Sequence, residues 1–506
     1  MFAEVFTASL EGIEAIGVNV EADAASIGMP SFNIVGLAET ALKESRDRVR
    51  SALKNLGYNI FARPITINLA PADFKKEGTH FDLPIALSLL AATGNLPENS
   101  LKDSLVLGEL SLDGRLRGVS GVISMAASAV ALGVKKIILP SSNGQEAALI
   151  KGAAVYPFDT LGDVAAFLRG DIKCEPISGC YSEIVEPVYG CDFSEVKGQF
   201  TARRAAEIAA AGMHNMILVG TPGSGKTMIA RRIPTILPLM TGQEALRSTK
   251  IHSAAGLLLE RGRLISERPF VNPHHTASSV AIIGGGTKAK PGQVSIASGG
   301  VLFLDEMLEF NRSVLEVLRQ PLEDKVVTIS RAKRTVTYPA DFMLVGAMNP
   351  CPCGYYGDAR RECTCTQTMI DRYRARLSGP MLDRIDIHIN VPAVEYKDIA
   401  SIADGESSAE IRKRVTAAHN IQRERFKDSH TVFNSAMTEK EMAKYCLLDE
   451  KGRNILEKAA EKFVLSARAC SKALKTARTI ADLAGSENIM PNHLLEALQL
   501  RTSGWD

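Results

Sequence analysis

Hydrophobic and polar positions divide the chain into a longer part with strands and a shorter part without them. Apolar runs of strand length alternate with helical patterns, such as that of residues 83–92, through most of the sequence. The runs typical of strands are residues 65–69, 136–140, 216–219, 301–304 and 342–347. After Tyr396 such runs disappear, and charged amphipathic stretches at 408–428 and 449–485 predict helices. The pattern therefore predicts an α/β protein with a helical C-terminal part.

The periodicity fades between residues 170 and 188, where glycine and proline interrupt it repeatedly. Because these residues break regular elements, we expect a linker at 171–189. The predicted domains are an α/β domain at 1–170, a second α/β domain at 190–395 and a helical domain at 396–506. A chain of 506 residues is too long for one hydrophobic core, which agrees with several domains.

The composition is that of an ordinary globular protein, with 45% hydrophobic and 23% charged residues. The first residues lack the basic region of a signal peptide, and no apolar run approaches the roughly 20 residues that span a bilayer. We therefore expect a cytoplasmic protein without membrane contact. The formal net charge of +2 means that any binding of nucleic acid must use a local basic patch.

The apolar run at 216–219 ends in a glycine-rich loop that is typical of phosphate binding. The pattern GxxxxGK[ST] is formed by Gly220, Thr221, Pro222, Gly223, Ser224, Gly225, Lys226 and Thr227. In this pattern backbone N–H groups cradle the phosphates, the lysine adds positive charge and the hydroxyl serves as a Mg²⁺ ligand. The alternative is an ordinary glycine-rich turn, but a strand before the loop and a helix after it are the context that phosphate binding needs. We therefore expect ATP and Mg²⁺ as cofactors.

Two further strands end in polar residues suited to ATP hydrolysis. Asp305 and Glu306 follow the run at 301–304, and Asn349 follows the run at 342–347. Asp305 could hold Mg²⁺ together with Thr227, Glu306 could polarise the attacking water, and Asn349 could orient that water. Each of them could be an ordinary strand end, but their order after the phosphate loop predicts an ATPase.

Four of the nine cysteines lie close together in a loop that contains glycine and proline. They are Cys351, Cys353, Cys363 and Cys365. Four thiolates in such a loop favour structural Zn²⁺. The spacing within each pair is C-x-C, shorter than is usual for zinc, so free thiols are the alternative.

Several motifs spread over nearly the full length resemble those of one family. They are residues 34–37 (IVGL), 68–73 (NLAPAD), 273–276 (PHHT), 321–324 (PLED), 349–354 (NPCPCG) and 378–386 (SGPMLDRID). The order of phosphate loop, Asp-Glu strand, polar sensor and LDRID motif is similar to that of the AAA+ ATPases. The whole set resembles the magnesium-chelatase-like ComM/YifB family.

The resemblance implies roles for residues whose function does not follow from spacing. Arg384, in the LDRID motif, would be the arginine finger that reaches the site of a neighbouring subunit, so the active form would be a homo-oligomeric ring, a hexamer. Arg468 resembles the second sensor of the lid; Arg478 on the same helix is the competing choice, and a solvated helix face is the alternative for both. Gln199 resembles the segment that contacts adenine.

The N-terminal domain resembles the proteolytic domain of Lon proteases, which uses a Ser–Lys pair. Ile85 corresponds to the serine, and the position of the lysine is close to Ile123. Neither isoleucine can attack a carbonyl or accept a proton. The resemblance therefore implies a Lon-like domain that lacks protease activity and helps to assemble the ring or guide a substrate.

A hairpin with a basic tip is predicted directly before the sensor strand. Two β-rich arms flank Arg331, Lys333 and Arg334. Related helicase rings project a hairpin into the central channel at this place, where basic side chains could grip DNA phosphates. A surface hairpin with a charged, edge-protecting turn is the alternative.

A second insertion separates the phosphate-loop helix from the Asp-Glu strand. It holds His274 and His275, for which we expect a packed or channel-lining role, because adjacent histidines rarely share one metal ion. Its glycine-rich loop carries Lys288 and Lys290 and could form a second pore element.

The leading hypothesis is an ATP-driven ring motor that acts on single-stranded or branched DNA. The resemblance implies a helicase or branch-migration translocase in recombination or natural transformation. One alternative is a chelatase-type ATPase subunit that remodels a partner protein, although such motors begin near the phosphate loop and here about 170 residues precede that module. A non-enzymatic nucleotide switch is the third, disfavoured by the presence of Glu306 and Arg384.

Overall fold

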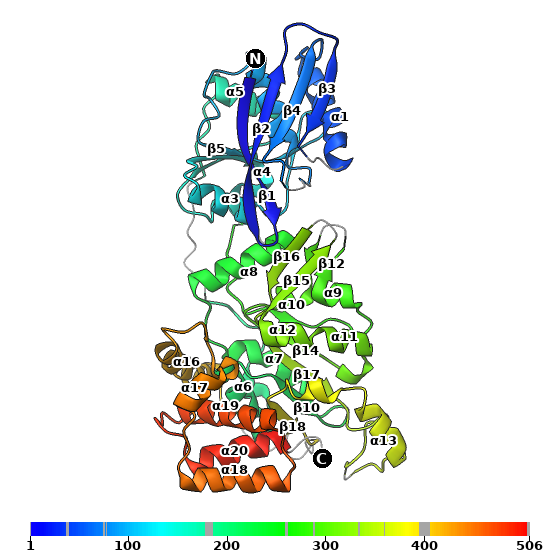
Figure 1. The fold of residues 1–506 in the computed structure, drawn as a ribbon, viewed down its shortest axis with the longest axis vertical. Helices are drawn as coiled ribbons and strands as arrows, with labels where there is room; N and C mark the ends of the chain where they lie inside the picture. Colours follow the sequence, from blue (N-terminus) through cyan, green and yellow to red (C-terminus); the bar gives the residue numbers. More distant parts are fainter. Residues whose placement is uncertain are drawn as a thin grey trace. The chain divides into compact units, whose positions relative to one another are not determined.

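The computed structural model describes residues 2–36, 40–73, 76, 78–177, 186–258, 262–286, 289–331, 334–358, 360–393 and 405–502. The chain divides into two compact units (Figure 1). The first comprises Met1–Val185 and Ala245–Ile265, and the second comprises Glu186–Glu244 and Ser266–Asp506. Residues Ala245–Ile265 thus group with the first unit, although the chain on both sides of them belongs to the second.

The described part of the first unit contains two larger sheets and a short antiparallel pair, β6 with β7. One has the strand order β1-β2-β4-β3, with β3 parallel to β4 and the other pairs antiparallel. The other is parallel and has the order β5-β8-β9. Its elements are β1 (Phe2–Glu11), β2 (Glu14–Ala24), β3 (Ser31–Val35), α1 (Thr40–Asn55), β4 (Pro64–Ala70), α2 (Asp82–Ala92), β5 (Ser104–Val106), β6 (Glu109–Leu110), β7 (Leu116–Arg117), α3 (Val122–Ala131), β8 (Lys136–Pro140), α4 (Ser141–Ala147), β9 (Ala154–Phe158) and α5 (Leu161–Arg169). The predicted strands at 65–69 and 136–140 and the helix at 83–92 are confirmed as β4, β8 and α2.

Helix α2 is the centre of the first unit's core. Its residues are apolar on every side and nearly all buried, as expected of a helix enclosed by protein, and it packs against β1 and β2. Its first residue, Asp82, accepts hydrogen bonds from Arg48 at 2.7 and 3.0 Å, so this buried carboxylate is paired. Ile85 in α2 and Ile123 in α3 are both fully buried in the apolar core.

The second unit contains a parallel sheet with the strand order β11-β14-β17-β10-β18. Strands β10, β14 and β17 are buried at every position, which explains why the sequence shows continuous apolar runs there. The elements of this core are α6 (Phe200–Gly212), β10 (Met216–Val219), α7 (Lys226–Ile236), α8 (Gly242–Ala255, mostly in the first unit), β11 (Phe270–Val271), α9 (Ser279–Ile283), β12 (Gly284–Gly285), β13 (Lys290–Pro291), α10 (Gln293–Ile296), β14 (Val301–Leu304), α11 (Arg312–Val317), α12 (Arg319–Asp324), β15 (Val326–Arg331), β16 (Arg334–Pro339), β17 (Met343–Met348), α13 (Gln367–Arg374), α14 (Gly379–Leu382) and β18 (Ile387–Asn390). The predicted strands at 216–219, 301–304 and 342–347 are confirmed as β10, β14 and β17.

The remaining residues of the second unit form a helical lid, coloured orange to red in Figure 1. Its helices are α16 (Ser408–Arg425), α17 (Glu439–Tyr445), α18 (Glu450–Lys462), α19 (Ala467–Leu483) and α20 (Pro491–Thr502). The amphipathic stretch at 449–485 forms two helices: Val464 adopts a left-handed conformation (φ 49°), and Ser466 caps α19 by accepting the N–H of Ala469. Helix α16 packs against α6 and α7, which ties the lid to the core. No helix in the described part of the chain has the length and apolar character needed to cross a bilayer.

Candidate nucleotide-binding site

The ends of three neighbouring parallel strands bring the predicted site residues together. Strand β17 lies between β14 and β10, so Asn349 at its end comes between the Asp305–Glu306 pair after β14 and the phosphate loop after β10. The phosphate loop passes into α7 through Gly225, whose φ of 91° is a left-handed conformation that favours glycine. The positive end of α7 therefore points at the loop, as anion binding requires.

Lys226 is buried within the phosphate loop. Its ammonium donates hydrogen bonds to the carbonyls of Gly220 (2.7 Å) and Thr221 (2.9 Å) and lies 3.4 Å from Oδ1 of Asn349. Burial lowers the pKa of Lys226 to about 8, although the charges of Asp305 and Glu306 act in the opposite direction. A bound triphosphate would add further negative charge, which favours the charged ammonium.

Thr227 and Asp305 form an oxygen pair suited to Mg²⁺. The hydroxyl of Thr227 donates a hydrogen bond of 2.9 Å to Oδ2 of Asp305. A hydroxyl and a carboxylate are the hard oxygen ligands that Mg²⁺ prefers, so the donor set fits this ion. Thr227 and Asp305 would hold the ion, which would supply positive charge beside the phosphates.

Glu306 occupies a strained and exposed position at the end of β14. Its backbone has a φ of 49°, uncommon for a residue other than glycine, and its N–H donates to Oδ1 of Asp305 at 3.0 Å. The side chain is 60% exposed, so it can meet a water molecule. Oε2 of Glu306 lies 3.8 Å from Nδ1 of His275. The packed or channel-lining role expected for His275 did not include this contact, which arises because β11, directly before the PHHT motif, pairs with β14.

Gln199 lies at the start of α6 and contacts the phosphate loop. Its side-chain amide donates to the carbonyl of Ser224 at 3.1 Å and to that of Pro392 at 2.6 Å. Gln199 thus links the phosphate loop to the segment after β18. This places it beside the site, as the expected contact with adenine requires.

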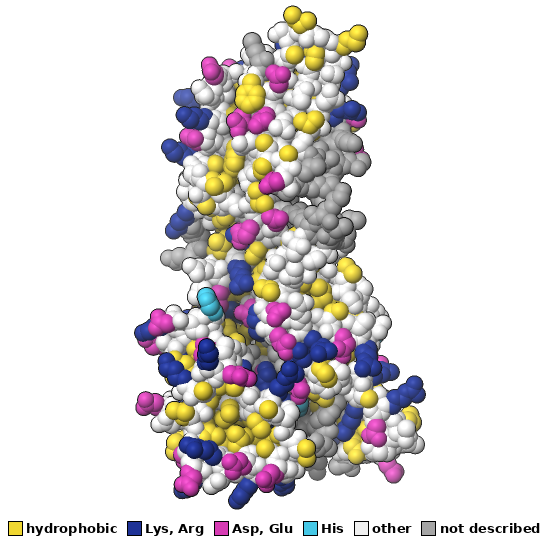
Figure 2. Space-filling model, in the orientation of Figure 1, with side chains coloured by type: hydrophobic (Ala, Val, Ile, Leu, Met, Phe, Trp, Pro, Cys, Tyr) yellow, Lys and Arg dark blue, Asp and Glu magenta, His cyan; other side chains and the backbone are white. Residues whose placement is uncertain are grey.

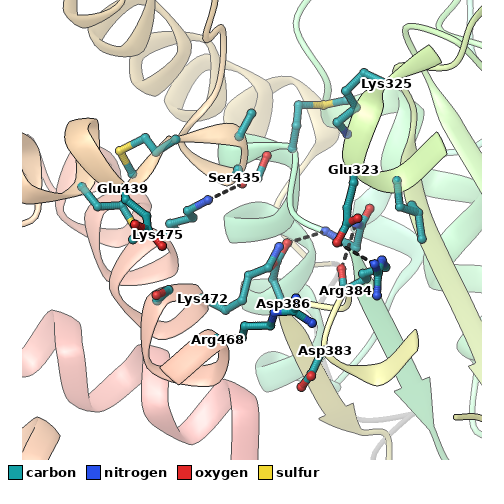
Figure 3. Close-up of a pocket in the computed structure, with 17 residues that line it drawn as sticks. Glu323, Lys325, Asp383, Arg384, Asp386, Ser435, Glu439, Arg468, Lys472 and Lys475 are labelled. Carbon is teal, nitrogen blue, oxygen red and sulfur yellow. Dashed lines mark hydrogen bonds and ion pairs between the residues drawn. The ribbon is translucent and has the colours of Figure 1, made fainter. Parts of the chain in front are cut away.

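Arg384 lies in a separate cavity between the core and the lid. The cavity has a volume of about 320 Å³ and is lined by Arg384, Arg468, Lys472 and Lys475, among others, but by no residue of the phosphate loop (Figure 3). Nη2 of Arg384 is 2.6 Å from Oε1 of Glu323, and the guanidinium also donates to backbone carbonyls of Arg319 and Pro380. Lys472 and Lys475 were not predicted from the sequence, because two lysines at this spacing are common on any half-exposed helix.

The two candidates for the second sensor differ in their surroundings. Arg478 is buried and donates hydrogen bonds to Asp482 and to the carbonyls of Ser486 and Glu487, which occupy its guanidinium. Arg468 is exposed and lines the same cavity as Arg384. The geometry favours Arg468 as a residue that can meet a nucleotide.

Asp386 lines this cavity and joins the core to the lid. Its carboxylate is 2.7 Å from Nζ of Lys472 and 3.4 Å from Nδ1 of His214, and it accepts the N–H of Asn215 at 3.0 Å. Burial opposes ionisation, but the charge of Lys472 and the contact with His214 outweigh it and hold the pKa of Asp386 well below its usual range.

The four clustered cysteines come together immediately after Asn349. Their sulfur atoms all lie within 4.8 Å of one another. The backbone N–H of Tyr355 lowers the pKa of the Cys353 thiol. The donor set fits Zn²⁺, so zinc in place of free thiols stays our prediction.

The predicted basic hairpin is present in its backbone. Strands β15 and β16 pair in antiparallel register from Val326 opposite Pro339 to Arg331 opposite Arg334. Lys333, the side chains of Arg331 and Arg334, and also Lys288 lie outside the described residues. On the face drawn in Figure 2, Lys and Arg side chains gather where the lid meets the core, with acidic side chains among them.

Together these features define a class of protein. A phosphate loop after β10, an Asp-Glu pair after β14, a polar sensor after β17 between them and a helical lid are the parts of an AAA+ module. Family models carry the same indication: "Magnesium chelatase, subunit ChlI" matches residues 192–399, its C-terminal part matches 405–501, and "Subunit ChlI of Mg-chelatase" matches 20–143.

Comparison with known proteins identifies the family. The protein YifB of Salmonella typhimurium is 43% identical over 501 residues, which cover 99% of this chain and 97% of YifB. The competence protein ComM of Haemophilus influenzae is 43% identical over 503 residues, with coverage of 99% and 97%. The magnesium-chelatase 38 kDa subunit of Cereibacter sphaeroides is 25% identical over 174 residues, which are 31% of this chain and 52% of that subunit. The chain belongs to the magnesium-chelatase-like ComM/YifB family.

Proposed function

We propose that this chain hydrolyses ATP with the aid of Mg²⁺ and works as a motor on DNA. The observation that carries the ATPase is the meeting of Lys226, Thr227, Asp305, Glu306 and Asn349 at three adjacent strand ends. Lys226 would hold the β- and γ-phosphates, and Thr227 and Asp305 would hold Mg²⁺. Glu306 would polarise the attacking water, and Asn349 would orient it.

The active form would be a homo-oligomeric ring, a hexamer. Arg384 lines a cavity that contains no phosphate-loop residue, which supports a role at the nucleotide of a neighbouring subunit in place of its own. A contact between two different surfaces of identical subunits generates a ring when the rotation closes. Arg384 would then be the arginine finger, because a guanidinium neutralises charge that develops on the transferred phosphoryl group.

The substrate along which the motor moves would be single-stranded or branched DNA. The β15–β16 hairpin carries three basic residues at or beside its tip, and such a tip can grip phosphates whatever the base sequence. The relative from Haemophilus influenzae bears the name competence protein. A helicase or branch-migration translocase in recombination or natural transformation accounts for both.

Alanine replacement of the hairpin's basic residues tests the DNA track. The test variant carries alanine at Arg331, Lys333 and Arg334. The control variant removes the same charge from exposed positions of the lid, at Lys413, Arg423 and Lys427. ATP turnover without DNA should survive in both, whereas separation of branched DNA strands should fall sharply only in the hairpin variant. Its DNA affinity should also depend less on salt, because fewer counterions are released.

Wild-type unwinding by the hairpin variant would place the DNA path elsewhere, and Lys290, which is exposed, would be examined next.

The second candidate function is a chelatase-type ATPase subunit that remodels a partner protein, and the description of the matching family models favours it. The match to the chelatase subunit covers only 31% of this chain, so the motor on DNA remains our proposal.

A further inference from the structure

The cysteine loop turns back onto the nucleotide site. It begins two residues after Asn349, and the N–H of Gly354 donates to the carbonyl of Cys351 at 3.0 Å, which closes the first turn. Gly354 is buried against the phosphate loop: a Cβ atom added there would lie 2.9 Å from both Cγ and Cδ of Pro222. The rigid proline ring cannot move aside as a flexible side chain would. The first turn of the cysteine loop is therefore packed directly on the phosphate loop.

The sulfur atoms are spaced as ligands of one metal ion. Cys351 and Cys353 are 3.3 Å apart, and the sulfur of Cys363 is 3.6 Å from each of them. A tetrahedral site with metal–sulfur bonds of about 2.3 Å has sulfur–sulfur edges of about 3.8 Å. Backbone N–H groups of Tyr356 and Cys365 donate to the sulfurs of Cys351 and Cys363 at 3.3 and 3.4 Å, which orients them as outer hydrogen bonds orient metal ligands. The sulfur atoms can thus surround one ion after small shifts that move them apart.

We propose that these four cysteines hold a divalent metal ion, which their ligand chemistry identifies as Zn²⁺. This ion acts as a strut: it supports the nucleotide site mechanically and thereby sets the rate of ATP hydrolysis. This inference rests on the proposed ATPase function. The ion fixes the turn that carries Gly354, and Gly354 in turn supports Pro222 and with it the phosphate loop. Asn349, two residues before the first ligand, is fixed by the same turn.

The strut acts on the geometry of hydrolysis more than on nucleotide binding. The carbonyl of Thr221, next to Pro222, and Oδ1 of Asn349 both face the ammonium of Lys226, at 2.9 and 3.4 Å. The Mg²⁺ pair Thr227 and Asp305 has no contact with the cysteine loop among the described hydrogen bonds. Loss of the ion should therefore displace Asn349 and the Thr221–Pro222 part of the phosphate loop, while the Mg²⁺ pair keeps its contact, so that kcat changes more than nucleotide affinity. A displacement of about 1 Å lowers a chemical rate by up to about a hundredfold.

The first experiment compares cysteine variants of the full chain. Elemental analysis of freshly reduced wild-type protein should give about one zinc per chain. Cys353→Ser with Cys363→Ser should lose the ion, lower kcat at least about tenfold and leave the affinity for a non-hydrolysable ATP analogue within about threefold. The matched control, Cys174→Ser with Cys470→Ser, removes two cysteines outside the cluster and should keep both zinc and kcat.

The second experiment breaks the contact without touching a ligand. Gly354 and Gly357 both have a left-handed backbone, with φ of 86° and 77°, so alanine strains each equally. Only at Gly354 does the new Cβ meet Pro222, because nothing lies within 4 Å of a Cβ at Gly357. Gly354→Ala should therefore retain zinc and lose kcat, whereas Gly357→Ala should retain both. Hydrogen exchange of the phosphate-loop amides should accelerate when zinc is chelated from the wild type and in Gly354→Ala.

These experiments distinguish a failure of the proposed strut from a failure of the proposed ATPase function. Wild-type protein that holds zinc but turns over no ATP would refute the proposed function, and exchange in the phosphate loop would still report on the strut. Turnover without zinc in the reduced wild type would overturn the metal site. Zinc-free cysteine variants with wild-type kcat, or equal kcat in Gly354→Ala and Gly357→Ala, would show that the cysteine loop does not control hydrolysis.

Discussion

The assignment of Arg384 to the neighbouring subunit makes a prediction that a mixing experiment can test. Arg384→Ala should bind ATP normally but lose hydrolysis by roughly a thousandfold or more, the contribution of an arginine finger. The loss should not come from unfolding. The ion pair that Arg384 forms with Glu323 has one partner 54% exposed, and such pairs contribute about 1 kcal/mol at most. Because Arg384 also donates to the carbonyls of Arg319 and Pro380, the melting temperature should fall by roughly a few degrees, and the variant should stay folded at the assay temperature.

The magnitude of rescue follows from the proposed ring. Lys226→Ala subunits are inactive at their own phosphate loop but still carry Arg384. In an equimolar, randomly mixed ring, a site is active when an Arg384→Ala subunit supplies the phosphate loop and a Lys226→Ala subunit supplies the arginine. Both conditions hold at about one quarter of the interfaces, whatever the number of subunits in the ring. Mixed rings should therefore recover about a quarter of the wild-type turnover, although each variant alone has almost none.

The assay is steady-state ATP turnover against the mixing ratio, with ring assembly followed by light scattering. Turnover should be greatest at equal amounts and fall toward zero at either end. Mixed rings that assemble and show no recovery would mean that Arg384 acts within its own subunit or not at all.

Three further predictions concern hydrolysis and the lid. Glu306→Gln should bind ATP and hydrolyse it at least about a hundredfold more slowly, and near-normal turnover would remove Glu306 from the mechanism. His275→Ala should lower kcat on the order of tenfold with little change in KM, and His275→Gln should restore part of it; equal values for both variants would assign His275 a packing role. Asp386→Asn should lower the free energy of unfolding by about 2–3 kcal/mol in denaturant titrations, less than for a fully buried pair because Lys472 is 22% exposed. Because the pKa of Asp386 is depressed in the folded state, this contribution should be complete above about pH 4 and decline below it, and equal stability of variant and wild type at pH 7 would contradict it.

The sequence predicted the strands of the second unit well because its sheet is parallel and buried on both faces. Such strands appear as unbroken apolar runs, and β10 and β14 have the expected bounds. The phosphate loop and the Asp-Glu pair follow these strands directly, so local sequence was sufficient to find them. The amphipathic pattern continues across the break between α18 and α19, which the left-handed backbone of Val464 and the helix cap at Ser466 mark.

Contacts between distant segments could not be predicted in the same way. His275 contacts Glu306 only because β11 and β14 are neighbours in the sheet. Neither the PHHT motif nor the Asp-Glu pair indicates this strand order. The partnership of Asp386 with Lys472 joins residues 86 positions apart, on a strand end and a lid helix. The packing of Gly354 on Pro222 likewise depends on the return path of a loop. Residue types were informative where the chemistry is local and uninformative where it depends on tertiary packing.

The central claim, an ATP-driven motor on DNA, is tested most directly by ATP turnover with and without DNA. Purified full-length protein with Mg²⁺ should hydrolyse ATP faster when single-stranded or branched DNA is added, and the increase should weaken as salt is raised. Glu306→Gln should bind the same DNA without turnover. An active ATPase whose rate is the same with and without every DNA tested would contradict the claim and favour a protein partner as the substrate.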